Sequence, residues 1–268
     1  MTTTMPMGVS IRKLDYHGGL ETGYSWEPAN PSTTLPEYDG ILRVLSAAFA
    51  GDSFTAAVHN KDPADEDYSY ATPFLMSPII GELLSPGGEV YVAEVDATDG
   101  ATKEIVGVCG WFAPGYEMFA SDTEQKYALF PFVGTLTVDL QDWWRTTFLP
   151  RWEGFLESSF GPNGNHTAWT LQTLAVHPDY HRRGIARMLL QPVFDKAQGE
   201  GGGAPMCVVT TKAQNLEVYR KLGFALIPTV KGGEGQSTEE CKHVFRSLRG
   251  VQVPVWVLAR GKIAGSEC

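Results

Sequence analysis

The chain has 268 residues, of which 43% are hydrophobic, and it carries a formal net charge of −10 at pH 7. This hydrophobic content is sufficient for a packed core, and the acidic balance argues against nucleic acid as a partner, because binding a phosphate backbone requires a cationic surface. No apolar run approaches the roughly 20 residues of a membrane span, and residues 1–7 lack the pattern of a signal peptide. We therefore expect a cytoplasmic protein without a membrane partner that acts on cationic or neutral substrates.

The cysteines are separated widely along the chain. They show no metal-ligand spacing, and two of them lie in apolar runs typical of buried strands. This distribution predicts reduced thiols and no metal site. The residues are Cys109, Cys207, Cys241 and Cys268.

In the first half of the chain, apolar residues recur with either a helical or an alternating period, and these periods predict helices and strands. The acidic segment lacks the glycine spacing of an EF-hand, so we expect a solvated loop there. In chain order, the patterns predict a strand at 9–14, an extended loop at 17–35, a helix at 37–50, the acidic loop at 60–69, a helix containing Pro78 at 74–84, and a hairpin of strands at 89–95 and 104–112 joined at Asp99-Gly100.

Residues 113–166 are rich in aromatic side chains on a predicted helix that Pro150 interrupts. Trp143 and Trp144 are adjacent, so they point about 100° apart and cannot both face one groove. Two interpretations stay open. The aromatics pack the segment onto the rest of the fold, or they form a lid or wall of a substrate pocket. The aromatics concerned are Trp143, Trp144, Phe148, Trp152 and Phe155.

The segment 169–224 is typical of strand, glycine-containing turn, helix, strand and helix in succession. The apolar strand over 171–178 must stop at Pro178, and a helix with apolar residues at helical spacing follows Gly184. The first turn of such a helix leaves backbone N–H groups free and carries a partial positive charge, so it suits a diphosphate. Gly184 allows a close backbone approach, and the neighbouring arginines add positive charge.

Toward the C-terminus, the patterns predict a buried strand at 206–211, a helix that opens at Asn215 and closes at Gly223, and a strand starting at Phe224. Residues 231–250 are expected to be a long connection with a short helix around 240–248. A last strand follows at 253–258, where Pro254 indicates an edge or bulge position. Residues after 262 are expected to be disordered.

Two motifs in this region resemble those of the GNAT superfamily of N-acetyltransferases. The run 174–190, containing His181-Arg182-Arg183-Gly184-Ile185-Ala186, is similar to the acyl-CoA motif, although the family usually has Gln or Arg where this chain has His181. The run 215–224 is similar to the motif N-x-x-x-Y-x-x-x-G-F. The resemblance implies a single domain over 1–268, with a core at about 8–260 and a GNAT-like mixed α/β sheet flanked by helices. The segment 113–166 is then an insertion of about fifty residues before the strand that leads into the pyrophosphate turn.

The resemblance also implies acetyl-CoA as the acyl donor and assigns residues to it. Backbone groups of the strand would hold the pantetheine arm, the turn would hold the diphosphate, and an imidazole near phosphate would make binding sensitive to pH unless His181 simply faces solvent. Asn215 would cap its helix, contact the pantetheine arm, or do both. The implied cofactor-binding residues are Leu174, Ala175, Val176, Arg182, Arg183, Gly184, Ile185, Ala186, Arg187, Asn215 and Tyr219.

Acyl transfer to an amine also requires a proton donor for the leaving thiolate and a means of obtaining a neutral amine. Tyr219 is the candidate acid, because the resemblance aligns it with the family's tyrosine and a phenol can donate to a thiolate. Many relatives carry a carboxylate on the strand before the turn, but this chain has Gln172 and Thr173 there. A water chain or an amine that arrives neutral would also serve. The other candidate bases are Glu117, Asp139, Asp142 and Glu153.

The leading hypothesis is therefore an acetyl-CoA-dependent N-acetyltransferase that acts on a primary amine of a small molecule. A protein or peptide N-acetyltransferase is the alternative enzyme, and it would need an open groove. A non-catalytic acyl-CoA-binding regulatory module is the alternative of a different class. The sequence leaves the acceptor amine, the general base, the acyl-chain length and the oligomeric state open.

Overall fold

The computed structural model describes residues 8–15, 35–65, 67–97, 102–161, 164–199, 203–227 and 241–261, so most of the predicted loop 17–35, the Asp99-Gly100 turn and the residues after 262 lie outside it. Eight strands form one sheet in the order β1-β2-β3-β4-β5-β8-β6, with β7 paired to β8. All neighbours are antiparallel except β4 and β5. The strands are β1 Ser10–Leu14, β2 Gly88–Asp96, β3 Lys103–Phe112, β4 Trp169–Val176, β5 Met206–Thr210, β6 Ala225–Leu226, β7 His243–Arg246 and β8 Gln252–Arg260.

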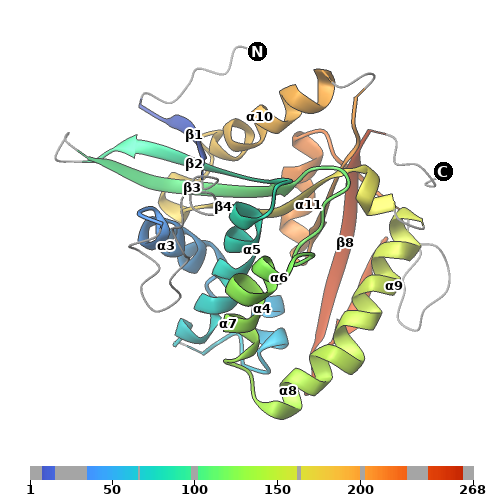
Figure 1. Ribbon diagram of the computed structural model, residues 1–268. Coiled ribbons are helices and arrows are strands. Elements are labelled where there is room, and N and C mark those ends of the chain that lie inside the picture. The colour runs from blue at the N-terminus through green and yellow to red at the C-terminus, as the bar shows by residue number, and fades with distance from the viewer. Residues whose placement is uncertain are drawn as a thin grey trace.

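Helices cover both faces of the sheet (Figure 1). α3 (Tyr38–Phe49) and α5 (Thr72–Leu84) bury their apolar residues against one face of β1 to β4. α10 (Ile185–Gly199) covers the opposite face, because Ile185, Leu189 and Val193 recur every four residues and are fully buried there. The predicted mixed α/β sheet flanked by helices is confirmed. None of the helices formed by the described residues is both long and apolar enough to cross a membrane.

The insertion between β3 and β4 is helical, and its aromatic side chains form a third core. Trp143 and Trp144 both belong to this core, with ring centroids 6.3 Å apart, and the cluster includes Phe245 of β7 and Val255 of β8. The aromatics thus pack the insertion onto the last strands. Its elements are α6 (Asp122–Glu124), η2 (Gln125–Leu129), α7 (Phe130–Val133), α8 (Val138–Trp143), η3 (Trp144–Phe148), α9 (Leu149–Phe160) and η4 (Gly164–Thr167).

Pro150 does not interrupt the insertion helix as predicted. Each of the two π-helical segments, η2 and η3, leads directly into an α-helix with proline in its first turn, at Pro131 and Pro150. Proline lacks the N–H that an α-helix would use, and a widened π turn accommodates this loss without ending the helix. The helical run therefore continues through both prolines.

Two further differences from the sequence prediction concern short elements. The helix expected around 240–248 is wrong: residues His243–Arg246 form β7, because their side chains alternate between buried and less buried positions against β8. The short helix α4 (Ser53–Val58) was not predicted, although Asp52 caps it by accepting from the Thr55 backbone N–H at 2.8 Å. The 3₁₀ turn η1 (Ser69–Ala71) then leads into α5, which continues through Pro78 as one helix.

Candidate active site

Strands β4 and β5 begin side by side and then separate. Three residue pairs join them, from Trp169 with Met206 to Leu171 with Val208, and within the described residues no pair follows. β4 nevertheless continues to Val176 and β5 to Thr210. The edge of β4 that faces β5 is thus open over its second half. An extended group can pair with such an edge as an added strand would.

The other edge of β4 stays paired with β3, but the register shifts at Gln172. Gly110 pairs with Thr173 and Trp111 with Leu171, so Gln172 has no partner, which is the arrangement of a β-bulge. Beyond the bulge, the His177 N–H donates to Val106 O at 2.9 Å. Alternate residues of a strand direct their backbone N–H and C=O groups to opposite neighbours. The backbone groups of Ala175 therefore face β3, and the N–H groups of Leu174 and Val176 face the open edge.

The turn after β4 projects into solvent and has an unusual backbone. η5 (Pro178–Tyr180) is followed by Arg182 and Gly184, whose φ angles are 61° and 79°. Both residues are exposed. A Cβ at Gly184 would meet no atom within 4 Å, so this position favours glycine for its conformation rather than for space. The turn delivers the chain into α10 with the first N–H groups of that helix unpaired.

The charged side chains of the turn are partly held by backbone carbonyls. Arg183 donates to Asp179 O at 3.0 Å and lies 4.9 Å from the Tyr180 ring, while Arg187 donates to Lys221 O at 3.1 Å. His181 Nε2 donates to Val176 O at 2.9 Å, so the imidazole is turned back toward the end of β4. Positive charge therefore surrounds the N-terminus of α10, where an anion is best stabilised.

Tyr219 lies on α11 (Ala213–Lys221), and its ring packs in the core beneath α10, 5.9 Å from the Phe224 ring. Burial raises the pKa of its phenol, so the hydroxyl stays protonated. Asn215 does not cap α11 as predicted, because the N-cap position is Lys212. The Asn215 amide instead donates to Thr210 Oγ1 at 3.3 Å, which ties the helix to the end of β5.

Residues 153–226 match the model of the acetyltransferase (GNAT) domain, a match that spans β4, the turn, α10, β5, α11 and β6. The chain carries a GNAT acetyltransferase domain over these residues. Its predicted family and its assignment as an N-acetyltransferase are thereby confirmed. The donor and acceptor are separate questions, and the residues that would bind them stay predictions.

Several solved structures resemble this acetyltransferase over most of its length. A Corynebacterium glutamicum protein described as histone acetyltransferase HPA2 and related acetyltransferase shares 16% identity, covers 97% of this chain and 100% of its own, and gives a TM-score of 0.49. A Drosophila melanogaster polyamine N-acetyltransferase shares 14% identity, with coverage of 95% and 100% and a TM-score of 0.49. A mosquito arylalkylamine N-acetyltransferase-like protein shares 17%, with coverage of 94% and 99% and a TM-score of 0.48. At these values, the likenesses say nothing about the substrate.

The four carboxylates suggested by the sequence as possible bases are all surface charges in this acetyltransferase. Glu117 lies 3.4 Å from His166, Asp142 lies 2.7 Å from Arg145, and Asp139 and Glu153 are exposed on α8 and α9. None of them is brought to the bulge of β4.

A different carboxylate, Glu82 of α5, lies against the sheet near the bulge and was missed by sequence reasoning. Its side chain is fully buried, and neither oxygen has a hydrogen-bond partner among the described residues. Burial raises the pKa of this carboxyl well above its ordinary value. The one signal in the sequence was that Glu82 is the only charged residue of an otherwise apolar helix.

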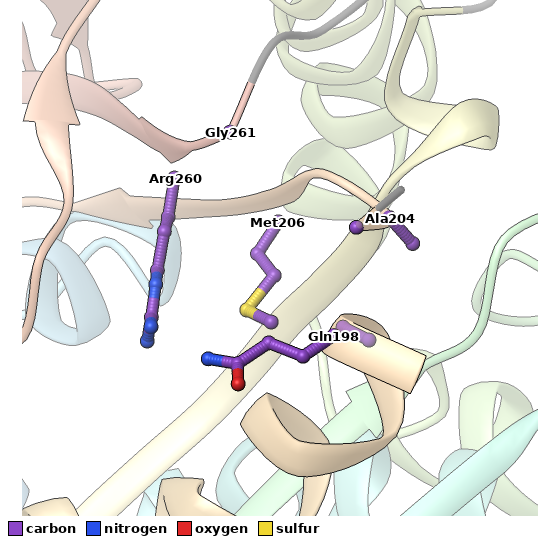
Figure 2. Close-up of a pocket in the computed structure, with 7 residues that line it drawn as sticks. Gln198, Ala204, Met206, Arg260 and Gly261 are labelled. Atoms are coloured by element: carbon purple, nitrogen blue, oxygen red, sulfur yellow. The ribbon is translucent and has the colours of Figure 1, made fainter. Parts of the chain in front are cut away.

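A pocket of about 330 Å³ opens elsewhere, between the C-terminal end of α10 and the start of β5 (Figure 2). Gln198 and Arg260 flank Met206 there, and Arg260 also packs over the Phe194 ring at 4.0 Å. The turn that follows β4 lies at the opposite end of α10. This pocket is therefore separate from the open edge of β4.

Proposed function

We propose that this protein transfers an acetyl group from acetyl-CoA to a primary amine of a small molecule. The observation that carries the proposal is the open edge of β4 beside β5, which ends at the exposed, arginine-rich turn before α10. A long donor with an amide-containing arm and a diphosphate fits both features. Its arm would extend the sheet and its diphosphate would cover the helix N-terminus.

On the donor side, the N–H groups of Leu174 and Val176 would bind the arm, because they face the open edge. Gly184, Ile185 and Ala186 would offer the free N–H groups of the turn and first helical residues. Arg182, Arg183 and Arg187 would balance the charge of the diphosphate. Ala175 would contribute through its side chain alone, since its backbone groups face β3.

Tyr219 would supply the proton for the leaving thiolate. Burial raises the pKa of its hydroxyl and keeps it protonated. A raised pKa makes the phenol a weaker acid on its own. The leaving thiolate, however, forms next to the phenol and can take its proton as the C–S bond breaks. Asn215, held by Thr210, would border the same space from the start of α11.

A small acceptor is supported by the first residues of the insertion. Met118 and Phe119 lie over Gly81 of α5, with Phe119 Cε1 3.3 Å from the position of a Cβ there, and Tyr116 fills the space above Gly87. These side chains pack over the last turns of α5 and over the turn between α5 and β2. A covered site suits a small amine better than an extended peptide. The net charge of −10 favours a cationic acceptor.

The proposal is tested by measuring CoA release from acetyl-CoA with polyamines, aromatic amines, amino acids and lysine peptides as separate acceptors. We expect release that depends on a small amine, with the acetylated product identified by mass. Release with lysine peptides alone would redirect the proposal to a protein N-acetyltransferase. Tight binding of acetyl-CoA without release on any acceptor would contradict the enzyme assignment and favour a regulatory module.

A further inference from the structure

Glu82 occupies a space that the sheet leaves for it. A Cβ on Gly110 of β3 would overlap the Glu82 carboxyl, and a Cβ on Gly88 of β2 would overlap its backbone carbonyl. Two neighbouring strands thus carry glycine where the last turn of α5 crosses them. The two glycines show that the fold itself, and not only the rotamer of Glu82, brings this side chain close to the sheet.

The space lies directly beside the point at which β4 leaves β5. Gly110 pairs with Thr173, the residue next to the unpaired Gln172 of the bulge. Val108 and Ala175 belong to the core under α5, and side chains alternate along strands, so Gly110 and Thr173 face α5 as well. The Glu82 carboxyl is therefore about one strand spacing, roughly 4.8 Å, from the strand whose other edge is open.

Stability does not account for this carboxyl. It is 0% exposed, and no cation or hydrogen-bond donor among the described residues reaches its oxygens. Buried groups of this kind are costly and are normally satisfied, so an orphaned one is associated with function. The covering loop is also strained, because Phe119 over Gly81 has a φ of 65°.

Resting on the proposed function, we propose that Glu82 is the proton acceptor for the amine, in place of a carboxylate on β4. The Glu82 carboxylate takes a proton from the amine nitrogen, directly or through one water. The nitrogen forms a bond to the acyl carbon, the C–S bond breaks, and the thiolate takes the Tyr219 proton. Tyr219 is reprotonated and Glu82 deprotonated by exchange with solvent, so that protons balance over the cycle.

The test compares Glu82→Gln, which keeps the shape of the side chain, with wild type, using acetyl-CoA and the panel amine that wild type acetylates fastest. We expect kcat to fall about 10²- to 10⁴-fold, with acetyl-CoA binding unchanged. Glu82→Asp keeps a base that is one methylene too short, and should retain partial activity. Glu124→Gln is the matched control, because Glu124 is also almost fully buried but accepts from Ser121 Oγ on α6.

The pH profile separates a proton acceptor from a structural carboxyl. In wild type, kcat/KM should rise with pH as Glu82 ionises, and this rise should be absent in Glu82→Gln and present in Glu124→Gln. Tyr116 of the covering loop is an ionisable residue that lies over the turn after α5. Cys109 of β3 points to the opposite face of the sheet, where its thiol donates to Leu189 O at 3.3 Å, and its pKa is raised by burial and further by Glu82. Cys109→Ser and Tyr116→Phe should keep the rise.

The outcomes distinguish this inference from the function on which it rests. If wild type acetylates an amine and Glu82→Gln does so at a similar rate with the same pH profile, Glu82 is not the base and the acetyltransferase stands. If wild type acetylates no amine, both proposals fail together. A Glu82→Gln protein that loses acetyl-CoA binding along with turnover would also overturn the inference, because a base on the acceptor side should not affect the donor.

Discussion

The proposed donor half of the site, from Leu174 to Tyr219, and the proposed acceptor half, around Glu82, are built in different ways. The donor half uses one stretch of chain and mostly backbone groups, presented by a strand edge and a helix N-terminus. The acceptor half joins a helix, two strands and the covering loop from separate parts of the chain, and it depends on one side chain. A site built from backbone groups tolerates substitution of its side chains, whereas a site that depends on one carboxylate loses its function when that residue is replaced.

Under this proposal, the difference explains why a local motif indicates the donor and leaves the acceptor open. A diphosphate is the same for every substrate, so the turn can be built from a fixed pattern of small and basic residues. The acceptor differs between enzymes, and its proton can be removed from any element that reaches the open strand. Here α5 reaches it because the glycines of β2 and β3 allow a close approach.

The largest effect is expected from Tyr219→Phe, which should lower kcat by about 10²- to 10⁴-fold by removing the proton donor. The KM for acetyl-CoA should change little, since the ring stays in place. Tyr91→Phe is the matched control, because Tyr91 is equally buried in the same core and donates to Glu89 at 2.7 Å. Turnover of Tyr219→Phe close to wild type would remove Tyr219 from this role.

The next effect is expected from Gly110→Ala, which would place a methyl group where the Glu82 carboxyl lies. The free energy of unfolding should fall by about 1–3 kcal/mol, as for other overpacked cores, and the rate of acyl transfer should decrease, though by less than in Tyr219→Phe. Acetyl-CoA binding, measured by calorimetry, should persist. In Gly154→Ala the new methyl meets no atom within 4 Å, so that control should fold and act normally. Loss of donor binding in Gly110→Ala would show that the two halves are coupled.

Much of the fold was predictable because its elements have clear periods. The strands β2, β3 and β4 alternate or run apolar, α10 has a four-residue apolar repeat, and the turn between β4 and α10 has a local pattern of its own. The strand β7 was not predictable, since four residues next to a polar, glycine-rich segment carry too weak a period. Its pairing with β8 decides its conformation, and no local pattern records that pairing.

The residues predicted to bind the donor lie on β4, the following turn, α10 and α11, and they stay a prediction, whereas Glu82 was not found from the sequence. Asn215 was expected to open α11, yet the helix begins at Ala213, a shift that residue type alone does not resolve. For Glu82, the sequence shows only a charge on an apolar helix. Its meaning depends on Gly110 and Thr173, which are brought to it by the pairing of β3 with β4. Such long-range contacts cannot be read from a single sequence.

A smaller effect in the donor half is expected from Gly184→Ala. The φ of 79° is unfavourable for a residue with a Cβ by roughly 1–2 kcal/mol, and any relaxation of the turn should weaken acetyl-CoA binding by about 5- to 30-fold. Gly250→Ala has a similar φ of 81° and equally open space at the β7–β8 turn, so it should lose stability without losing affinity. Equal affinities in both variants would contradict binding at the α10 turn.

The smallest effect is expected on the stability of Glu82→Gln, and its sign depends on pH. Burial raises the pKa of Glu82 in the folded state above the unfolded value, so the wild-type free energy of unfolding should decrease as pH rises from the unfolded pKa through the folded one. Glutamine does not ionise, so its free energy of unfolding does not decrease over this pH range. The variant should therefore become more stable than wild type there by about 1 kcal/mol, or roughly 2–4 °C in Tm. Thermal unfolding at several pH values would measure this difference.

A Glu82→Gln variant that is more stable yet inactive would indicate that the buried carboxylate is kept for chemistry. A loss of stability at every pH would instead indicate that Glu82 makes a hydrogen bond that holds α5 to the sheet.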